Sequence, residues 1–151
     1  MTSAFVHPVR VLYADTDQGG IVYHANYLRF FEAARAELLR ALGLPYAEVE
    51  RQGYVFPVVE VGLRHRRPAR YDDVLSIEVG VVALSPMSLT LSYAARLPAG
   101  EVCAEGSTRL ACTRRADGRP VPLPAAWRAL LASAAARDGR LPPRLPANHG
   151  G

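Results

Sequence analysis

The 151-residue sequence predicts an α+β fold in which a curved antiparallel β-sheet wraps a long central helix. Apolar residues recur at helical spacing over one long segment near the N-terminus. Four later segments are rich in β-forming residues, and the links between them are short. Because the helix is apolar over much of its circumference, we expect the sheet to curl around it. The edges of such a sheet invite pairing with a second copy of the chain.

The first two elements are a strand and the long helix. Phe5–Ala14 alternates and contains several valines, which predicts a strand. The helix is expected from about His24 to Leu42, followed by Gly43 as its C-terminal stop. A short second helix is expected over Pro45–Gln52. One face of the long helix carries apolar residues at helical spacing: Tyr27, Phe31, Ala34, Leu38 and Leu42.

The rest of the chain is predicted to form strands and one closing helix. The closing helix is amphipathic and spans Ala125–Arg137. We therefore expect one domain over residues 1–137 and a disordered tail rich in Pro and Gly over residues 138–151. The four expected strands are Val55–Arg66, Val74–Leu84, Ser88–Leu97 and Glu101–Arg114.

Composition limits the class of protein. The 18 basic residues are all arginine and face 14 acidic ones, which gives a net charge of +4 and suits an anionic ligand. No aromatic residues interleave with the arginines, so we expect no nucleic-acid partner. No apolar run approaches the roughly 20 residues of a membrane span, and no signal peptide is apparent, so we expect a cytoplasmic protein without membrane insertion.

The two cysteines, Cys103 and Cys112, fall within one predicted strand. A strand of that length holds its ends too far apart for a disulfide, so both are expected to be reduced core residues. No cysteine or histidine spacing indicates a metal, and we expect no cofactor.

The segment from Tyr13 to Tyr27 contains the candidate catalytic residues. It contains Asp15 and Asp17, then the pair Gly19-Gly20, and leads into the long helix. Glycines let the backbone approach a ligand closely, and the first turn of a helix offers free N–H groups with partial positive charge. Such donors can stabilise an oxyanion while a nearby carboxylate acts as base or nucleophile. Aspartates before a helix are also common caps, so the segment alone leaves both interpretations open.

The pattern Asp15-x-Asp17-x-x-Gly20-Ile21-Val22-Tyr23-His24-x-Asn26-Tyr27 resembles the signature of the 4-hydroxybenzoyl-CoA thioesterase family. It is most similar to the Tol-Pal-associated acyl-CoA thioesterase branch, which also spaces the aspartate and histidine seven positions apart. A second block, Arg67-Pro68-Ala69-Arg70-Tyr71-Asp72-Asp73-Val74-Leu75, resembles the family's other recurring segment. The likeness runs from about Val9 to Pro124.

The resemblance implies the hot-dog fold and hydrolysis of a small acyl-CoA, with a short aliphatic or an aromatic acyl group. It also implies a homodimer whose sheets join edge to edge, often paired into a homotetramer, with active sites at the dimer interface. Asp17 matches the catalytic carboxylate, and Asp15 is then a structural partner of the loop. His24 matches a histidine near the thioester. The other expected substrate-binding residues are Gly20, Tyr23, Asn26 and Arg67, with the backbone N–H groups around Tyr23 and His24 polarising the thioester carbonyl.

The sequence departs from the family at one place. The 4-hydroxybenzoyl-CoA branch has a basic cluster after its third strand, where this chain has the uncharged Ser85-Pro86-Met87. CoA phosphates must then be bound elsewhere, and six arginines are candidates: Arg64, Arg66, Arg67, Arg70, Arg114 and Arg115. Two other functions stay open, a hot-dog hydratase or dehydratase and a non-catalytic CoA-binding or scaffold protein.

Overall fold

The computed structural model describes residues 5–135 of the chain. The expected tail at 138–151 lies outside these residues. The closing helix ends at Ser133, short of the expected Arg137. In chain order the elements are β1 Phe5–Arg10, the 3-10 turn η1 Tyr13–Asp15, α1 Asn26–Ala41, α2 Tyr46–Arg51, β2 Tyr54–Val55, β3 Val58–His65, β4 Val74–Ser85, β5 Ser88–Arg96, β6 Val102–Ala111, β7 Thr113–Arg114 and α3 Ala125–Ser133.

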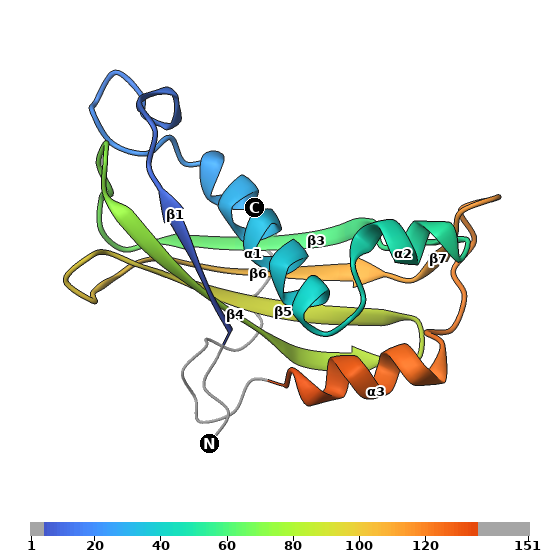
Figure 1. Cartoon of the computed structure of the whole chain (residues 1–151). Helices are drawn as coiled ribbons and strands as arrows, with labels where there is room; N and C mark the ends of the chain where they lie inside the picture. Colours follow the sequence, from blue (N-terminus) through green and yellow to red (C-terminus); the bar gives the residue numbers. More distant parts are fainter. Residues whose placement is uncertain (1–4, 136–151) are drawn as a thin grey trace.

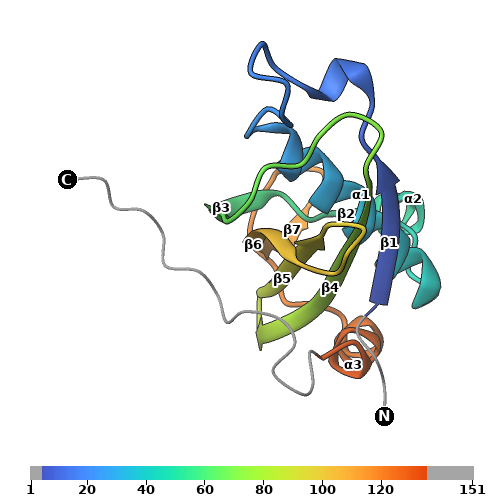
Figure 2. The same ribbon diagram turned by 90° about the vertical axis from the view of Figure 1, so that its left-hand side faces the viewer.

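The main sheet has five strands in the order β1-β4-β5-β6-β3, and all neighbouring strands are antiparallel. Figure 1 shows α1 lying across this sheet, and Figure 2 shows it inside the curve between β1 and β3. This is the predicted α+β arrangement of a long helix wrapped by a curved antiparallel sheet. Its two edges are β1 and β3, of which β3 presents the half-exposed valines Val58, Val59 and Val61.

The helix packs very closely on the middle of the sheet. The Phe31 ring stacks on the Tyr93 ring of β5, with centroids 4.6 Å apart. A Cβ added to Gly106 of β6 would lie 2.4 Å from the Phe31 ring, so only glycine lets the ring lie this close to the strand. Phe31 and Tyr93 are both fully buried, so this contact is shielded from solvent.

The predicted elements are correct in kind, but three strands are interrupted. The first ends at Arg10, because Asp15 accepts a hydrogen bond from the Leu12 N–H and holds the following residues in the 3-10 turn. The segment from Val55 is broken around Pro57, which has no N–H to donate. The segment from Glu101 is broken at Cys112, so that its last two residues leave the main sheet. β2 and β7, the short pieces beyond these breaks, form a separate two-stranded sheet.

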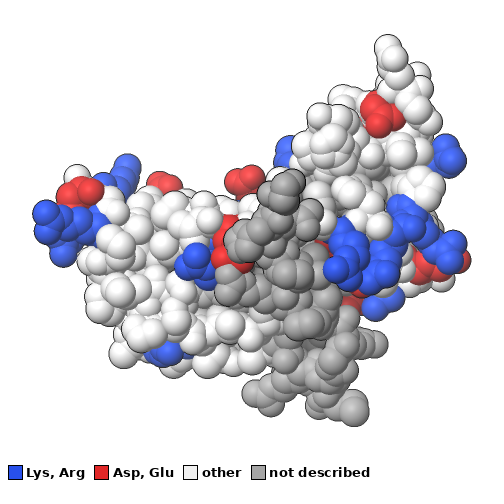
Figure 3. All heavy atoms as spheres, turned by 180° about the vertical axis from the view of Figure 1, so that it is seen from behind, with Lys and Arg blue, Asp and Glu red and all other residues white. Residues whose placement is uncertain are grey.

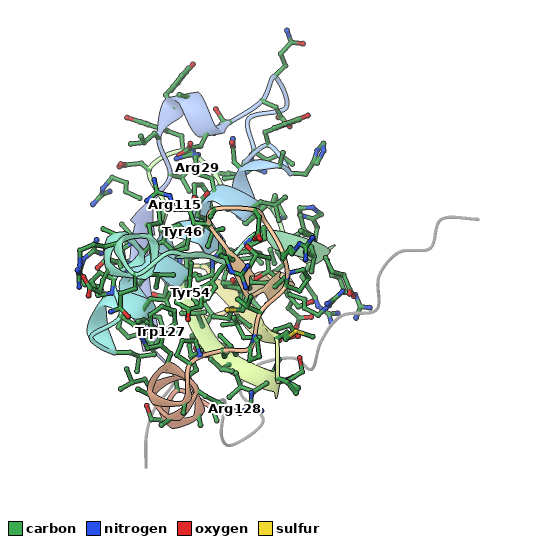
Figure 4. All side chains as sticks on the ribbon, turned by 90° about the vertical axis from the view of Figure 1, so that its right-hand side faces the viewer. Arg29, Tyr46, Tyr54, Arg115, Trp127 and Arg128 are labelled. Carbon is green, nitrogen blue, oxygen red and sulfur yellow. The ribbon has the colours of Figure 1, made fainter. Side chains whose placement is uncertain are left out.

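The short sheet and α3 close one end of the molecule. Trp127 of α3 makes edge contacts with the rings of Tyr54 and Phe56, at centroid distances of 4.9 and 6.0 Å. Figure 4 looks onto this end, where Tyr54 and Trp127 lie near one another. Cys103 and Cys112 are both buried and unbridged, as expected. Within the described part of the chain, α1 and the other helices lack the length and apolar character for a bilayer span.

Candidate active site

The loop between β1 and α1 forms a small hairpin around Asp17. The Asp17 N–H donates to the Ile21 carbonyl at 2.9 Å, and the Gly20 N–H donates to the Asp17 carbonyl at 3.0 Å. Gly20 has φ +76°, a left-handed conformation that favours glycine. The Asp17 side chain also takes part, since its Oδ1 accepts the Gly19 N–H at 2.8 Å. These bonds hold the Asp17 carboxylate in a defined orientation.

Asp15 anchors this loop to the start of α1. Its side chain is only 2% exposed, accepts the Leu12 N–H at 2.8 Å, and forms an ion pair with Arg29 of α1. Its backbone carbonyl accepts hydrogen bonds from the Tyr23 N–H and the Asn26 side chain, both at 2.9 Å. Because these contacts tie Asp15 to the loop and to the start of α1, we interpret it as a structural residue.

Asp17 and His24 line one cleft. The cleft has a volume of about 430 Å³, and Asp17 is exposed in the single chain. Oδ1 of Asp17 is held by Gly19, and Oδ2 accepts no hydrogen bond from any residue between 5 and 135. One carboxylate oxygen is thus free to take a proton or attack a carbonyl. The cleft is lined by Asp17, Ile21, Val22, His24, Tyr27, His65, Arg66, Arg67 and Pro68.

Three aromatic side chains form one wall of the cleft. The His65 ring, at the end of β3, makes edge contacts with Tyr27 and His24, at centroid distances of 5.4 and 6.4 Å. Burial, together with the nearby His24, holds the pKa of His65 below its ordinary value. Burial raises the pKa of Tyr27, and its hydroxyl donates to the Cys103 sulfur at 3.9 Å. Tyr27 is therefore a neutral wall residue.

Three expected substrate-binding residues, Gly20, Tyr23 and Asn26, do not line the cleft. Gly20 shapes the hairpin, and Asn26 ties the loop to Asp15. The Tyr23 N–H is also occupied, because it donates to the Asp15 carbonyl, so it cannot polarise a thioester as expected. The His24 N–H has no acceptor among the described residues, and α1 has no side-chain cap. The helix start thus keeps a donor that a substrate oxygen could use.

Arginines surround the mouth of the cleft. Arg66 and Arg67 lie on its lining and pair with Glu105 and Glu101 across the ends of the strands, at 3.1 and 3.6 Å. The Arg67–Glu101 pair joins two exposed side chains and is weak, whereas the Glu105 side chain is only 17% exposed. The guanidinium groups of Arg64 and Arg70 form no ion pair within residues 5–135, although the backbone N–H of Arg70 donates to the Asp73 carboxylate at 2.9 Å. Figure 3 shows basic side chains gathered on this face of the molecule with acidic ones among them.

Arg114 and Arg115 lie elsewhere. They line a second hollow together with Gly53 and Tyr54, which precede β3, whereas the cleft adjoins residues at the end of β3. Figure 4 shows Arg115 on the end of the molecule that carries Tyr54. Within one chain these two arginines therefore do not contribute to the Asp17 cleft.

The chain is similar to known thioesterases over most of its length. Residues 11–131 match the model of the Thioesterase-like superfamily. The chain belongs to this superfamily. Acyl-CoA thioesterase YbgC of Haemophilus influenzae is 36% identical over 126 residues, which cover 82% of this chain and 91% of the relative.

Solved structures confirm the hot-dog fold of the superfamily for this chain. A hypothetical protein from Thermus thermophilus superposes with a TM-score of 0.82 at 37% identity, covering 87% of this chain and 99% of its own. The DHNA-CoA thioesterase of Staphylococcus aureus gives a TM-score of 0.81 at 27% identity, covering 85% and 88% of the two chains.

Sequence reasoning missed two residues of this thioesterase-like site. Arg29 lies 14 positions after Asp15, and only the turn of the loop brings the two together. His65 stands inside the dense run of arginines from Arg64 to Arg70, which suggested either a solvated strand end or anion binding and did not single out the histidine. Strand alternation held a usable signal, because within β3 His65 and Leu63 point to the helix side of the sheet while Arg64 points away.

Proposed function

We propose that this protein is an acyl-CoA thioesterase that hydrolyses a small acyl-CoA to the free acid and CoA. The observation that carries the proposal is the placement of Asp17 beside His24 in a cleft at the start of α1. One oxygen of that carboxylate is held by the loop, and the other is free. The superfamily membership and the similarity to an acyl-CoA thioesterase support the same activity.

The cleft can supply each element of thioester hydrolysis. The thioester oxygen would accept the free His24 N–H at the helix start, where one well-placed donor contributes about 2.7–4 kcal/mol to transition-state binding. Asp17 then either removes a proton from the attacking water or attacks the carbonyl to form an anhydride that water cleaves. In both routes the acyl carbon gains an oxygen and the sulfur leaves with the electrons of the C–S bond.

The acyl group that we propose is a short aliphatic or an aromatic one. The cleft, at about 430 Å³, is of the size that small ligands occupy. The missing basic cluster at Ser85-Pro86-Met87 argues against 4-hydroxybenzoyl-CoA. Arg67, on the lining, is the proposed contact for the anionic part of CoA, with Arg66 next to it on the lining.

We also propose that two copies pair through β3 in a cytoplasmic homodimer, which can associate further into a homotetramer. β3 is an edge strand with Val58, Val59 and Val61 exposed by 42, 48 and 41%. Antiparallel pairing about its middle would set the beginning of one β3 beside the end of the other. The hollow lined by Arg114 and Arg115 in one copy would then face the Asp17 cleft of the other.

Thiol release from a panel of acyl-CoA substrates tests this function. We expect the purified protein to release free CoA from short-chain or aromatic acyl-CoA. A hydratase or dehydratase would alter the acyl chain and leave the thioester intact. A scaffold protein would bind acyl-CoA without turnover, and a nucleic-acid protein would bind DNA or RNA with strong salt dependence. Absence of thiol release across the whole panel would contradict the proposal.

A further inference from the structure

His65 is a titratable side chain on the cleft lining that the hydrolysis described above does not use. It is the last residue of β3, and its backbone is paired with Ala104 of β6, which fixes the position of its Cα at the cleft wall. Its ring meets the rings of Tyr27 and His24 edge-on. No residue from 5 to 135 forms a hydrogen bond with the imidazole. An N–H of this ring is therefore available to a molecule in the cleft.

The charge state of the cleft favours a neutral His65. The charged or titratable groups around it are Asp17 and His24 from the loop, Tyr27 from α1, and Arg66 and Arg67 from the same strand end. Burial is the main cause that lowers the pKa of His65, and the nearby His24 lowers it further. A neutral imidazole still has one N–H donor.

The order of residues along the strand end indicates which part of a thioester would meet this donor. His65 lines the cleft together with Asp17 and His24, its ring lies 6.4 Å from that of His24, and Arg66 and Arg67 of the lining follow it directly along the chain. In an acyl-CoA the sulfur joins the acyl group to the arm that leads to the phosphates. If the carbonyl lies near Asp17 and the phosphates lie near Arg67, we expect the sulfur to lie next to His65.

We propose that His65 is a catalytic residue that donates a hydrogen bond from its neutral imidazole to the departing sulfur. When the C–S bond breaks, its electron pair passes to sulfur, and the N–H of His65 stabilises the thiolate that forms. The thiolate then takes up the proton that the attacking water gives up, from Asp17 or through solvent, so the imidazole ends the cycle as it began. This role rests on the proposed thioesterase activity, and it is a case of a fixed dipole aimed at developing charge.

A series of leaving groups tests the proposal. His65→Phe keeps a ring against Tyr27 but removes the donor, whereas His65→Gln keeps an N–H donor. An alkyl thiolate such as CoA concentrates charge on sulfur, whereas a thiophenolate spreads charge into its ring. We expect His65→Phe to lower kcat/KM for an acyl-CoA by roughly tenfold or more, and for the thiophenyl ester of the same acid by less than about threefold. His65→Gln should retain most of the activity on both substrates.

The matched control is His7→Phe, since His7 is a histidine of β1 that does not line the cleft. This change should leave the ratio of the two kcat/KM values unaltered. Equal losses on both substrates with His65→Phe would show a purely structural role for His65 and overturn the proposal, as would no loss on either. The failure of the proposed function is a separate result, because the wild-type protein would then release no thiol from either ester.

Discussion

Asp15 and Asp17 are two residues apart, and the structure gives them opposite environments. Asp15 is buried and fully engaged with Leu12 and Arg29, whereas Asp17 is exposed and has one oxygen free. The sequence segment alone left both interpretations open for the two aspartates, and only the family resemblance predicted different roles for them. The structure adds the physical cause, since a carboxylate locked by an ion pair and a backbone donor has little capacity left to accept a proton from water.

We expect Asp15→Asn to lower the free energy of unfolding by about 1–3 kcal/mol, because a buried carboxylate that pairs with Arg29 is lost. Urea denaturation measures the change. Asp72→Asn is the control, since the ion pair of Asp72 with Arg10 joins side chains that are 63 and 57% exposed. Its effect should stay within about 0.5 kcal/mol. Equal effects of the two substitutions would show that Asp15 does not anchor the loop.

His65 gives a prediction on pH. Burial and the nearby His24 lower its pKa, so we expect it to titrate below its ordinary value of 6.5. Because the folded protein then binds fewer protons at His65 than the unfolded chain, this group's contribution makes the fold less stable as the pH drops below 6.5. His24→Phe removes a like charge and should raise the pKa of His65, though burial keeps it lowered. NMR titration of the ring protons measures the pKa of His65 in both proteins. An ordinary pKa in the wild type, unchanged by His24→Phe, would contradict these contacts.

At the scale of elements, the sequence predicted the kind and order of the helices and main strands. Hydrophobic spacing placed α1 at about His24–Leu42, close to the observed Asn26–Ala41. The breaks in the strands were not predicted, because they depend on contacts made after folding. β7 leaves the main sheet to pair with β2, and no local pattern around Cys112 signals that partner. For His65, strand alternation indicated the helix side of the sheet, but its contacts with α1 and the loop could not be predicted locally.

The close approach of α1 to β6 makes Gly106→Ala a sharp test of the packing. Its new methyl group would lie 2.4 Å from the Phe31 ring, which is stacked on Tyr93 and cannot move freely. We expect a loss of about 1–3 kcal/mol in the free energy of unfolding. Phe31→Leu in the same chain should offset part of this loss, so a double-mutant cycle by thermal or urea unfolding would give a coupling energy clearly different from zero. Strict additivity of the two changes would contradict the contact.

At the scale of the whole molecule, the open edge of β3 links assembly to activity. Val61→Lys places a charge on that edge, where Val61 is 41% exposed. We expect it to shift the protein from dimer to monomer in sedimentation velocity, and to lower thioesterase activity because two chains would complete each site. Val6→Lys is the control, since Val6 is 49% exposed on the opposite edge strand β1. A dimer that survives Val61→Lys but not Val6→Lys would show that the interface lies on β1, which would contradict pairing through β3.

The most direct test of the central role of Asp17 separates turnover from binding in the variant Asp17→Asn. The amide keeps the shape of the side chain but can act neither as a base nor as a carboxylate nucleophile. We expect kcat for thiol release to fall by about 10²–10⁴-fold, while the Kd for a non-hydrolysable acyl-CoA analogue stays within a few fold of the wild-type value. A folded Asp17→Asn variant that releases thiol at near the wild-type rate would contradict the assignment of Asp17.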